Sequence, residues 1–408
     1  MAIEAIKSFP RYERYKDSGV EWIGEIPEHW DVLRLGSFFE ERREIVSDVD
    51  YPPLSVTMKG IVPQLESAAK SQDGNNRKLV CTGDFVINSR SDRKGSSGVS
   101  PLDGSVSLIN IVLKPNGISP SYTNYLLKSY TFIEEYYRIG RGIVADLWTT
   151  RYSEMKNIMV SFPPVIEQTA IAQFLDHKTA QIDRAIAIKE AQIALLNERK
   201  QIMIQEAVTK GLDPTVPMKD SGVEWIGEIP AHWEVKKLKY FGSIKSGDGI
   251  TNSELKEQGV YEVFGGNGFM GYSDKYNIIG EKLIIGRVGA YCGNVRYVNE
   301  KKWISDNALV LNLRSGMSFE YIKYVLESFN LNKLNTSNAQ PLITGSKVMN
   351  VALPLPTERE RKKILEFIYK NDRKIIKAIL SLKNQIQTLK EYKTTLINEA
   401  VTGKIKIN

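Results

Sequence analysis

Two segments of the chain each carry one narrow apolar stripe. Within residues 182–207 and 375–400, the mostly apolar positions are spaced alternately by four and three residues. This heptad pattern predicts long helices that each bury one seam against another helix. The seam positions are Ile182, Ile186, Lys189, Ile193, Leu196, Lys200, Met203 and Ala207 in the first segment, and Ile375, Ile379, Leu382, Ile386, Leu389, Lys393, Leu396 and Ala400 in the second.

The flanking residues predict where these helices begin and end. Pro163 and Pro164 fit the opening of the first, Thr357 with Glu360 forms a capping box for the second, and Gly211 and Gly403 end them. Each helix then has about 44 residues and a length of roughly 65 Å. We expect the two to pack antiparallel, which relates two equivalent halves by a pseudo-twofold axis. The alternative is two independent helices that dock on separate partners.

Residues 36–162 and 239–355 show a different pattern. Short apolar runs such as DFVIN and NALVLNL alternate with Gly, Asn and Asp, which predicts strands and turns. Each region also holds one helical candidate directly after a strand, at residues 119–130 and 318–329. We therefore expect two α+β domains of one fold with different surfaces.

An internal repeat supports this division. Residues 16–35 return at 219–238 with 16 of 20 identical at a spacing of 203, and the helical segments align at a spacing of 193. A repeat at fixed spacing determines the architecture before any single motif does. The predicted domains are residues 1–162, 163–212 (first long helix), 213–355 and 356–408 (second long helix and tail). The repeat also predicts that the two ends of the chain lie close together.

Composition and charge exclude several classes of protein. The chain is 42% apolar and 25% charged, and no apolar run is long enough to span a bilayer, so we expect a cytoplasmic protein without a membrane contact. Cys81 and Cys292 do not correspond in the repeat, which argues against a disulfide or a cysteine zinc site. No P-loop or amino-methyltransferase motif occurs. His29 and His232 do correspond, and we expect them to pack or cap.

The net charge of +7 does not by itself establish binding to DNA, because both variable regions are only weakly basic. Residues 358–408 contain 13 basic and 6 acidic residues, so this arm accounts for the surplus. Its first turns carry a basic group that could face DNA, an acidic partner or solvent: Arg359, Arg361, Lys362 and Lys363.

The full chain resembles the specificity subunit of type I restriction-modification systems. The resemblance is carried by the two GVEWIGEIPxHW segments, the two long related helices, GRVGAYCGNV at 286–295 and NAQPLITGSKVMNVALPLP at 338–356. In the first half, residues 140–164 stand in for this last segment without its Gln-containing tip. The fold that the resemblance implies is α+β, with two α/β target recognition domains separated by an antiparallel coiled coil.

The resemblance also implies a function. The chain would be a non-catalytic subunit that binds double-stranded DNA, each domain reading one half of a split, asymmetric site. The helices would space the half-sites and dock two methyltransferase (modification) subunits, which use S-adenosylmethionine. Restriction subunits, which use ATP and Mg, complete such a complex. We expect this chain itself to bind no cofactor and no metal.

Base reading requires paired donors and acceptors on loops of a rigid scaffold, since Arg matches guanine and Asn or Gln matches adenine. Polar, Gly-containing loops in the variable regions supply the candidates, although each loop alone is more often a solvated turn. In the first region they are Asn75, Asn76, Arg77, Lys78, Asn88, Ser89, Arg90, Ser91, Arg93 and Lys94; in the second they are Lys245, Asn267, Arg287, Tyr291, Asn294, Asn338, Gln340 and Lys347.

A second hypothesis comes from the near-neutral charge of both variable regions. The chain could be a coiled-coil protein adaptor with two ligand-binding domains and no role on DNA. The two hypotheses differ in the salt dependence of DNA binding, which is steep only for a DNA reader.

Overall fold

The structure is a computed structural model that describes residues 6, 8–66, 74–142, 148–251, 253–289, 291–335 and 341–407. The chain forms two compact units. Unit 1 contains Met1–Glu190 and Leu382–Asn408, and unit 2 contains Ala191–Ser381. Each unit thus holds one variable region together with one end of each long helix. Strands and helices are mixed in both, so the fold is α+β.

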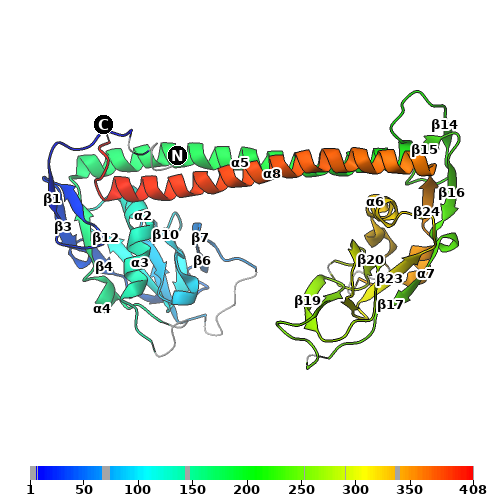
Figure 1. The fold of residues 1–408 in the computed structure, drawn as a ribbon. Helices are drawn as coiled ribbons and strands as arrows, with labels where there is room; N and C mark the ends of the chain where they lie inside the picture. The colour runs from blue at the N-terminus through cyan, green and yellow to red at the C-terminus, as the bar shows by residue number, and fades with distance from the viewer. Residues whose placement is uncertain are drawn as a thin grey trace. The chain divides into compact units, whose positions relative to one another are not determined.

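Two long helices, α5 (Val165–Lys210) and α8 (Glu358–Val401), are shared between the units. In unit 1 the Nζ atom of Lys393 lies 2.7 Å from Asp183, and in unit 2 that of Lys200 lies 2.6 Å from Asp372. Higher numbers on one helix meet lower numbers on the other, so the helices run antiparallel within each unit (Figure 1).

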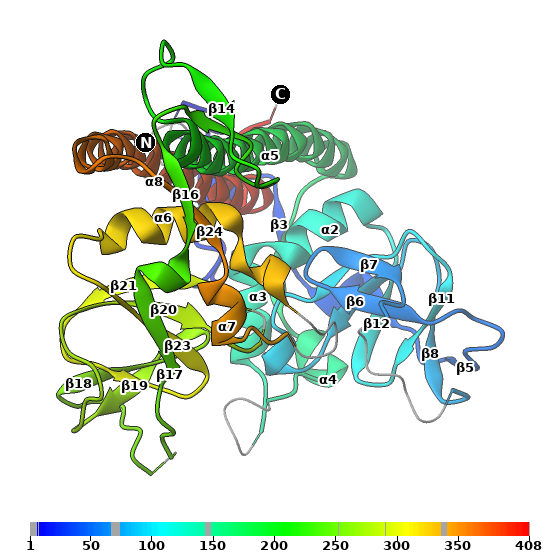
Figure 2. The same cartoon turned by 90° about the vertical axis from the view of Figure 1, so that its right-hand side faces the viewer.

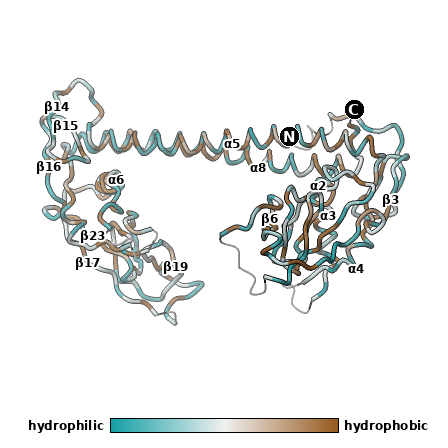
Figure 3. The backbone as a smooth tube through the Cα atoms, turned by 180° about the vertical axis from the view of Figure 1, so that it is seen from behind, coloured by the Kyte–Doolittle hydropathy of each residue, from teal (hydrophilic) through white to brown (hydrophobic). Residues whose placement is uncertain are grey.

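The helix seam has the burial expected from the heptad pattern. Every seam position from Ile182 to Ala207 and from Ile375 to Ala400 is buried or partly buried. Hydrophobic and hydrophilic positions alternate along both helices in Figure 3. The lysines within the seam are bound across it: Lys189 Nζ donates to Gln385 Oε1 at 2.6 Å, and Lys200 and Lys393 form the ion pairs above.

The predicted helix ends are confirmed. The backbone N–H of Thr357 donates to Glu360 Oε2 at 2.9 Å, and the N–H of Glu360 donates to Thr357 Oγ1 at 3.4 Å, which is the capping box. Gly211 and Gly403 follow the two helices with φ values of 75° and 73°. This left-handed conformation costs a glycine little, and it ends a helix.

In unit 1 a four-stranded sheet, ordered β10-β9-β12-β4, forms the centre of the variable region. Around it lie a three-stranded sheet, β11-β8-β5, and the pairs β6-β7, β13-β3 and β1-β2. The strands are β1 (Tyr15–Asp17), β2 (Glu25–Pro27), β3 (Asp31–Arg34), β4 (Phe39–Glu41), β5 (Ile45–Val46), β6 (Leu54–Thr57), β7 (Gly60–Pro63), β8 (Arg77–Val80), β9 (Phe85–Asn88), β10 (Ser97–Val99), β11 (Gly104–Ser107), β12 (Asn110–Pro115) and β13 (Met159–Phe162).

The two faces of this sheet enter two cores. Phe85 and Ile87 of β9 pack in a core with helix α2 (Pro120–Lys128), helix α3 (Tyr130–Arg138) and the end of α8. Val86, which points to the opposite face, packs with Val80 of β8 and Val106 of β11. This alternation is the period of two expected of a strand. A short helix, α4 (Tyr152–Met155), precedes β13.

Unit 2 repeats this arrangement. Its four-stranded sheet is ordered β17-β23-β20-β21, a three-stranded sheet is ordered β19-β18-β22, and the pairs are β16-β24 and β14-β15. The strands are β14 (Met218–Asp220), β15 (Glu228–Pro230), β16 (Glu234–Lys237), β17 (Gly242–Ser246), β18 (Tyr261–Gly265), β19 (Gly268–Ser273), β20 (Glu281–Gly286), β21 (Val295–Asn299), β22 (Trp303–Ile304), β23 (Ala308–Leu313) and β24 (Ala352–Leu355).

Helix α6 (Phe319–Phe329) covers one face of this sheet, where Ile322 and Val325 pack with Leu283 and Ile285 of β20 (Figure 2). A short helix, α7 (Gly345–Met349), precedes β24. The helices expected at 119–130 and 318–329 are therefore confirmed as α2 and α6. Helix α3, which continues the first of them after Ser129, was not predicted.

Candidate nucleic-acid interface

One edge of the central sheet in unit 1 places several polar residues side by side. Strand β9 ends at Asn88, which pairs with Asn110 at the start of β12. After β9, residues 89–91 run alongside residues 148–150, which lead to β13. The N–H of Thr150 donates to the carbonyl of Ser89 at 3.0 Å, that of Ser91 donates to Trp148 at 2.9 Å, and Arg90 bridges to Thr149.

The same edge is built in unit 2 with the same backbone bonds. Strand β20 ends at Gly286, which pairs with Ala308 at the start of β23. The N–H of Ile343 donates to the carbonyl of Arg287 at 3.0 Å, and that of Gly289 donates to Pro341 at 3.3 Å. Val288 bridges to Leu342. In each of these bonds, the residue that follows the strand lies 198 positions after its counterpart in unit 1, and its partner lies 193 positions after. The two edges are therefore structurally equivalent.

The side chains at the two edges differ. Where unit 1 has Ser89 and Arg90, unit 2 has Arg287 and Val288. Because side chains alternate between the faces of extended backbone, the arginine points to opposite faces in the two units. Arg287 Nη1 donates to Ser246 Oγ at 3.4 Å, while its Nε atom is buried with no hydrogen-bond partner among the described residues. One scaffold thus presents two sets of donors.

Two grooves flank this edge in unit 1. The first, of about 790 Å³, is lined by Arg43, Lys78, Arg90 and Arg151 together with the carboxylate of Glu41. The second, of about 760 Å³, is lined by Arg77, Arg93 and Lys94 with Asp92. Asn110 and Ile109 line both grooves. A surface with more basic than acidic groups beside a rigid sheet edge suits an anionic polymer.

Of the residues predicted in the first variable region, five are exposed at the surface of unit 1. Arg93 keeps 69% of its side chain exposed and Arg90 45%, and both lie about 4 Å from Asp92. Asn75 and Asn76 are exposed just before β8. Lys94 is also accessible, although its Nζ atom binds Glu134 at 2.6 Å. The guanidinium groups of Arg90 and Arg93 are thus accessible at the surface.

Other predicted residues of unit 1 hold the scaffold. Arg77 is only 4% exposed, and its Nε atom donates to Ser105 Oγ at 2.8 Å, which ties β8 to β11. Burial lowers the pKa of its guanidinium. Lys78 Nζ donates to the Asn110 carbonyl at 2.9 Å. Asn88 and Ser89 are buried, and the Ser91 hydroxyl is enclosed.

In unit 2 three predicted residues gather at the edge itself. Asn267 lies at the exposed turn between β18 and β19, and a Cβ atom on Gly289 would lie 3.6 Å from its Oδ1 atom. Arg287 follows β20, and Lys245 is exposed on β17, which runs in the same direction as β20. The carboxyl ends of these two strands therefore meet at one edge.

The remaining predicted residues of unit 2 are dispersed. Tyr291 is 55% exposed just beyond the edge. Asn294 lines a pocket of about 840 Å³ formed with α5, α6 and α8. Lys347 Nζ donates to the Leu334 carbonyl at 3.1 Å, so it fixes α7. Asn338 and Gln340 lie outside the described residues.

Three arginines at these edges were missed from the sequence. Arg43 and Arg151 line the first groove of unit 1, and Arg296 lies against the β18–β19 turn, where a Cβ atom on Gly268 would meet its Nη2 atom at 2.8 Å. Arg43 follows Arg42 just after β4, Arg151 lies between Thr150 and Tyr152, and Arg296 lies within β21, so none stands in one of the polar, Gly-containing loops that supplied the candidates.

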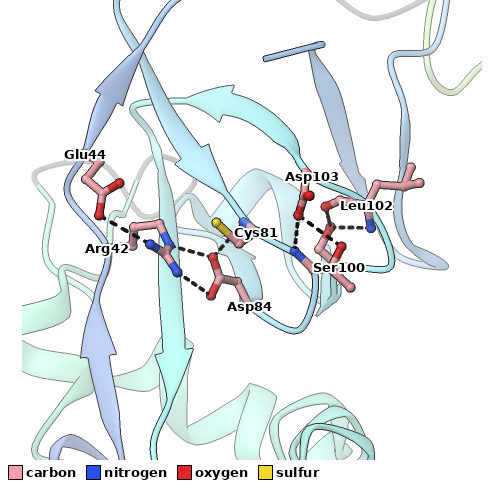
Figure 4. A network of polar contacts seen from close by, with 8 residues as sticks. Arg42, Glu44, Cys81, Asp84, Ser100, Leu102 and Asp103 are labelled. Carbon is pink, nitrogen blue, oxygen red and sulfur yellow. Dashed lines mark hydrogen bonds and ion pairs between the residues drawn. The ribbon is translucent and has the colours of Figure 1, made fainter. Parts of the chain in front are cut away.

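An ion pair at the far end of β9 fixes the orientation of the sheet edge. Arg42 Nε donates to Asp84 Oδ2 at 2.7 Å and Nη2 donates to Oδ1 at 3.2 Å, which gives a two-pronged contact (Figure 4). The hydrogen bond to Asp84 raises the pKa of Arg42. Asp84 also accepts from the N–H of Cys81 at 2.8 Å. Both charges are largely buried, so the pair is a rigid link between β4 and the start of β9.

Each half begins with a GVEWIGEIPxHW segment, here called its lead-in. The repeated His-Trp pairs bind this lead-in to the long helix of the same half. His29 Nε2 lies 2.6 Å from Glu167 Oε1, and Trp30 Nε1 donates to Glu167 Oε2 at 3.0 Å. In unit 2, His232 and Trp233 contact Glu360 in the same way. Both histidines therefore have a structural role at the start of a long helix, as the repeat indicated, and neither lines the two grooves of unit 1.

The C-terminal end of each long helix packs into the domain of the other half. In unit 1 the Tyr122 hydroxyl donates to the Val401 carbonyl of α8 at 3.3 Å. In unit 2 the Tyr321 hydroxyl donates to the Val208 carbonyl of α5 at 3.1 Å. The backbone N–H of Lys406 donates to the Pro10 carbonyl at 2.7 Å, which confirms that the end of the chain returns to its beginning.

No cluster of three or more His, Cys, Asp or Glu side chains suited to a metal ion occurs among the described residues. Within the same residues, no helix combines the length and the apolar character needed to cross a membrane. In the basic turn of α8, Arg361 donates to the Gly316 carbonyl and Lys362 pairs with Glu358 at 2.8 Å. Arg359 and Lys363 remain exposed.

Comparisons with known proteins agree on one family. The model of the type I restriction modification DNA specificity domain matches residues 230–388. The type I restriction enzyme MjaVIII specificity subunit of Methanocaldococcus jannaschii is 26% identical and aligns over 94% of both chains. The type I restriction enzyme EcoprrI specificity subunit of Escherichia coli is 30% identical over 36% of this chain and 35% of its own.

A solved structure shares the fold. It comes from work on complex assembly and conformational transition of the type I R-M system, and its chain matches with a TM-score of 0.69 at 16% identity. The match covers 92% of this chain and 98% of the other. Along nearly its whole length, the chain is thus similar to type I restriction enzyme specificity subunits.

Proposed function

We propose that this chain is the DNA sequence-specificity subunit of a type I restriction-modification complex. Each variable region is a target recognition domain that reads one half of a bipartite, asymmetric site. The chain itself carries no catalytic residue; the methyltransferase subunits supply S-adenosylmethionine chemistry, and restriction subunits supply ATP- and Mg-dependent chemistry.

One observation carries this proposal. The two sheet edges have the same backbone bonds at constant spacings of 198 and 193 residues, yet the side chains that they present differ, as Ser89-Arg90 against Arg287-Val288 shows. A duplicated scaffold with different side chains at equivalent positions suits a protein that recognises two different sequences. Two copies of one catalytic site would instead have kept their polar residues in common.

The long helices support a spacing role. Their antiparallel pairing in each unit, with each helix end packed into the domain of the other half, fits a coiled coil with pseudo-twofold symmetry. Such a coiled coil holds the half-sites at a fixed separation and offers equivalent surfaces to two methyltransferase subunits. The proposed domain limits are residues 1–162, 163–212, 213–355 and 356–408.

The test is a filter-binding titration of the assembled complex of this chain with its methyltransferase subunits. The expected affinity for duplex DNA falls steeply as salt rises, because each neutralised phosphate releases counterions. Mapping methylated adenines in cells with and without the chain then gives the bipartite site. A complex with no salt-dependent DNA binding contradicts the proposal and favours the adaptor.

A further inference from the structure

An aliphatic turn lies between the two grooves of unit 1. Leu108 and Ile109 connect β11 to β12, and each is 44% exposed. Ile109 lines both grooves, and Leu108 lines the first. Turns are usually built from Gly, Asn, Asp, Ser or Pro. Single exposed apolar residues are common, but two neighbours at a turn tip beside polar grooves indicate a contact outside the chain.

Basic side chains surround this turn. Arg43, Arg90 and Arg151 line the first groove with Leu108, and Arg93 and Lys94 line the second with Ile109. An apolar tip within a basic surface complements the major groove of a DNA duplex. The phosphates attract the cations, and the 5-methyl group of thymine offers an apolar contact.

The second unit provides an internal comparison. The N–H of Ser89 donates to the Ile109 carbonyl at 3.3 Å, and that of Arg287 donates to the Asn307 carbonyl at 3.0 Å. Arg287 and Asn307 each lie 198 positions after their counterparts Ser89 and Ile109, so Asp306 and Asn307 occupy the place of Leu108 and Ile109. The same tip is thus aliphatic in one unit and polar in the other.

We propose that Leu108 and Ile109 read thymine in the half-site bound by unit 1, through apolar contact with its 5-methyl group. Asp306 and Asn307 make polar contacts with base edges at the equivalent place in unit 2. This inference rests on the proposed function, and it names the base chemistry that distinguishes the two half-sites.

The experiment uses the full chain in complex with its methyltransferase subunits and a duplex that carries the mapped site. Thymines are replaced one at a time by deoxyuridine, which lacks only the methyl group. For the wild-type complex we expect about a fourfold loss of affinity at one or more positions of one half-site, as for exposure of one methyl-sized group. The double variant Leu108→Ala, Ile109→Ala is expected to lose this sensitivity there and nowhere else.

Two further variants control for the fold. Leu102→Ala changes another exposed leucine, 36% accessible, in a turn at the opposite end of β9, and it is expected to keep the wild-type sensitivity. The double variant Leu108→Asp, Ile109→Asn places the tip of unit 2 in unit 1. It is expected to weaken discrimination in the same half-site and to leave the other half-site unchanged.

Two results overturn the inference. Either the wild-type complex binds every deoxyuridine duplex as tightly as the thymine duplex, or the alanine double variant stays as sensitive as the wild type. In both cases site-specific binding by the wild type would still support the proposed function. A wild-type complex without any site-specific binding would instead refute the proposed function itself.

Discussion

The indole Nε1 atom of Trp233 donates a hydrogen bond to the carboxylate of Glu360 at 3.1 Å, which fastens the second lead-in to the first turn of α8. His232 and the Thr357 hydroxyl contact the same carboxylate at 2.8 Å and 2.6 Å. Burial opposes ionisation of Glu360, but the hydrogen bonds from Thr357, Trp233 and His232 outweigh it and lower its pKa to about 2.

This contact predicts a pH dependence of stability. Because the ionised form is the bound one, its contribution is complete above the unfolded pKa of about 4.3 and is lost as pH falls toward 2. We expect Glu360→Gln to lower the free energy of unfolding at pH 7 by about 1–3 kcal/mol and to weaken the decline between pH 5 and pH 2. Urea unfolding at a series of pH values measures both effects.

Glu358→Gln is the matched control, since Glu358 lies in the same helical turn, pairs with Lys362 and keeps 71% of its side chain exposed. It should change stability by less than about 1 kcal/mol. The prediction would be contradicted if the free energy of unfolding declined equally between pH 5 and pH 2 in the wild type and in Glu360→Gln.

The polar seam residues predict a coupling between the helices. Lys200 and Asp372 are 31% and 19% exposed, and they are joined across the seam at 2.6 Å. A double-mutant cycle with Lys200→Gln and Asp372→Asn should give a coupling of about 1 kcal/mol in the free energy of unfolding. The exchanged pair Lys200→Asp with Asp372→Lys should recover part of the loss. The exposed pair Glu206–Lys210, at 3.6 Å within α5, should show almost none.

Arg77 and Arg93 predict opposite phenotypes although both lie in the first variable region. Arg77→Ala removes buried hydrogen bonds to Ser105, so we expect the free energy of unfolding to fall by about 1–3 kcal/mol. Arg93→Ala, like Arg90→Ala, should leave stability unchanged and relax readout of one half-site by about 1–3 kcal/mol. Thermal unfolding and methylation-site mapping separate the two. Unchanged site choice in both Arg90→Ala and Arg93→Ala would remove that loop from the interface.

The proposed coiled coil predicts the behaviour of a ruler. An insertion of seven residues into the middle of both α5 and α8 adds one heptad and keeps the seam in register. We expect the methylated site to gain base pairs between its half-sites without any change in either half-site. Insertion of four residues in both helices breaks the heptad and should abolish modification. A change in the bases read after the seven-residue insertion would contradict this.

The sequence already determined the duplicated architecture, the two long helices with their ends, and the existence of two related α+β domains. These features are local or repetitive: a heptad stripe, a capping box at Thr357 and Glu360, and the glycines that follow each helix are visible without any knowledge of distant contacts. Even the role of His29 and His232 followed from their repetition beside tryptophan.

Only the tertiary structure decided which polar residues are available at the sheet edges. Arg77 and Arg93 look alike in sequence, but Arg77 is enclosed between β8 and β11, whereas Arg93 is exposed beside a groove. Arg43, Arg151 and the turn Leu108-Ile109 come together with Arg90 from separate segments, through strand pairing over long distances along the chain. Local patterns specify helices and turns, but burial and proximity depend on how β4, β9 and β12 pair.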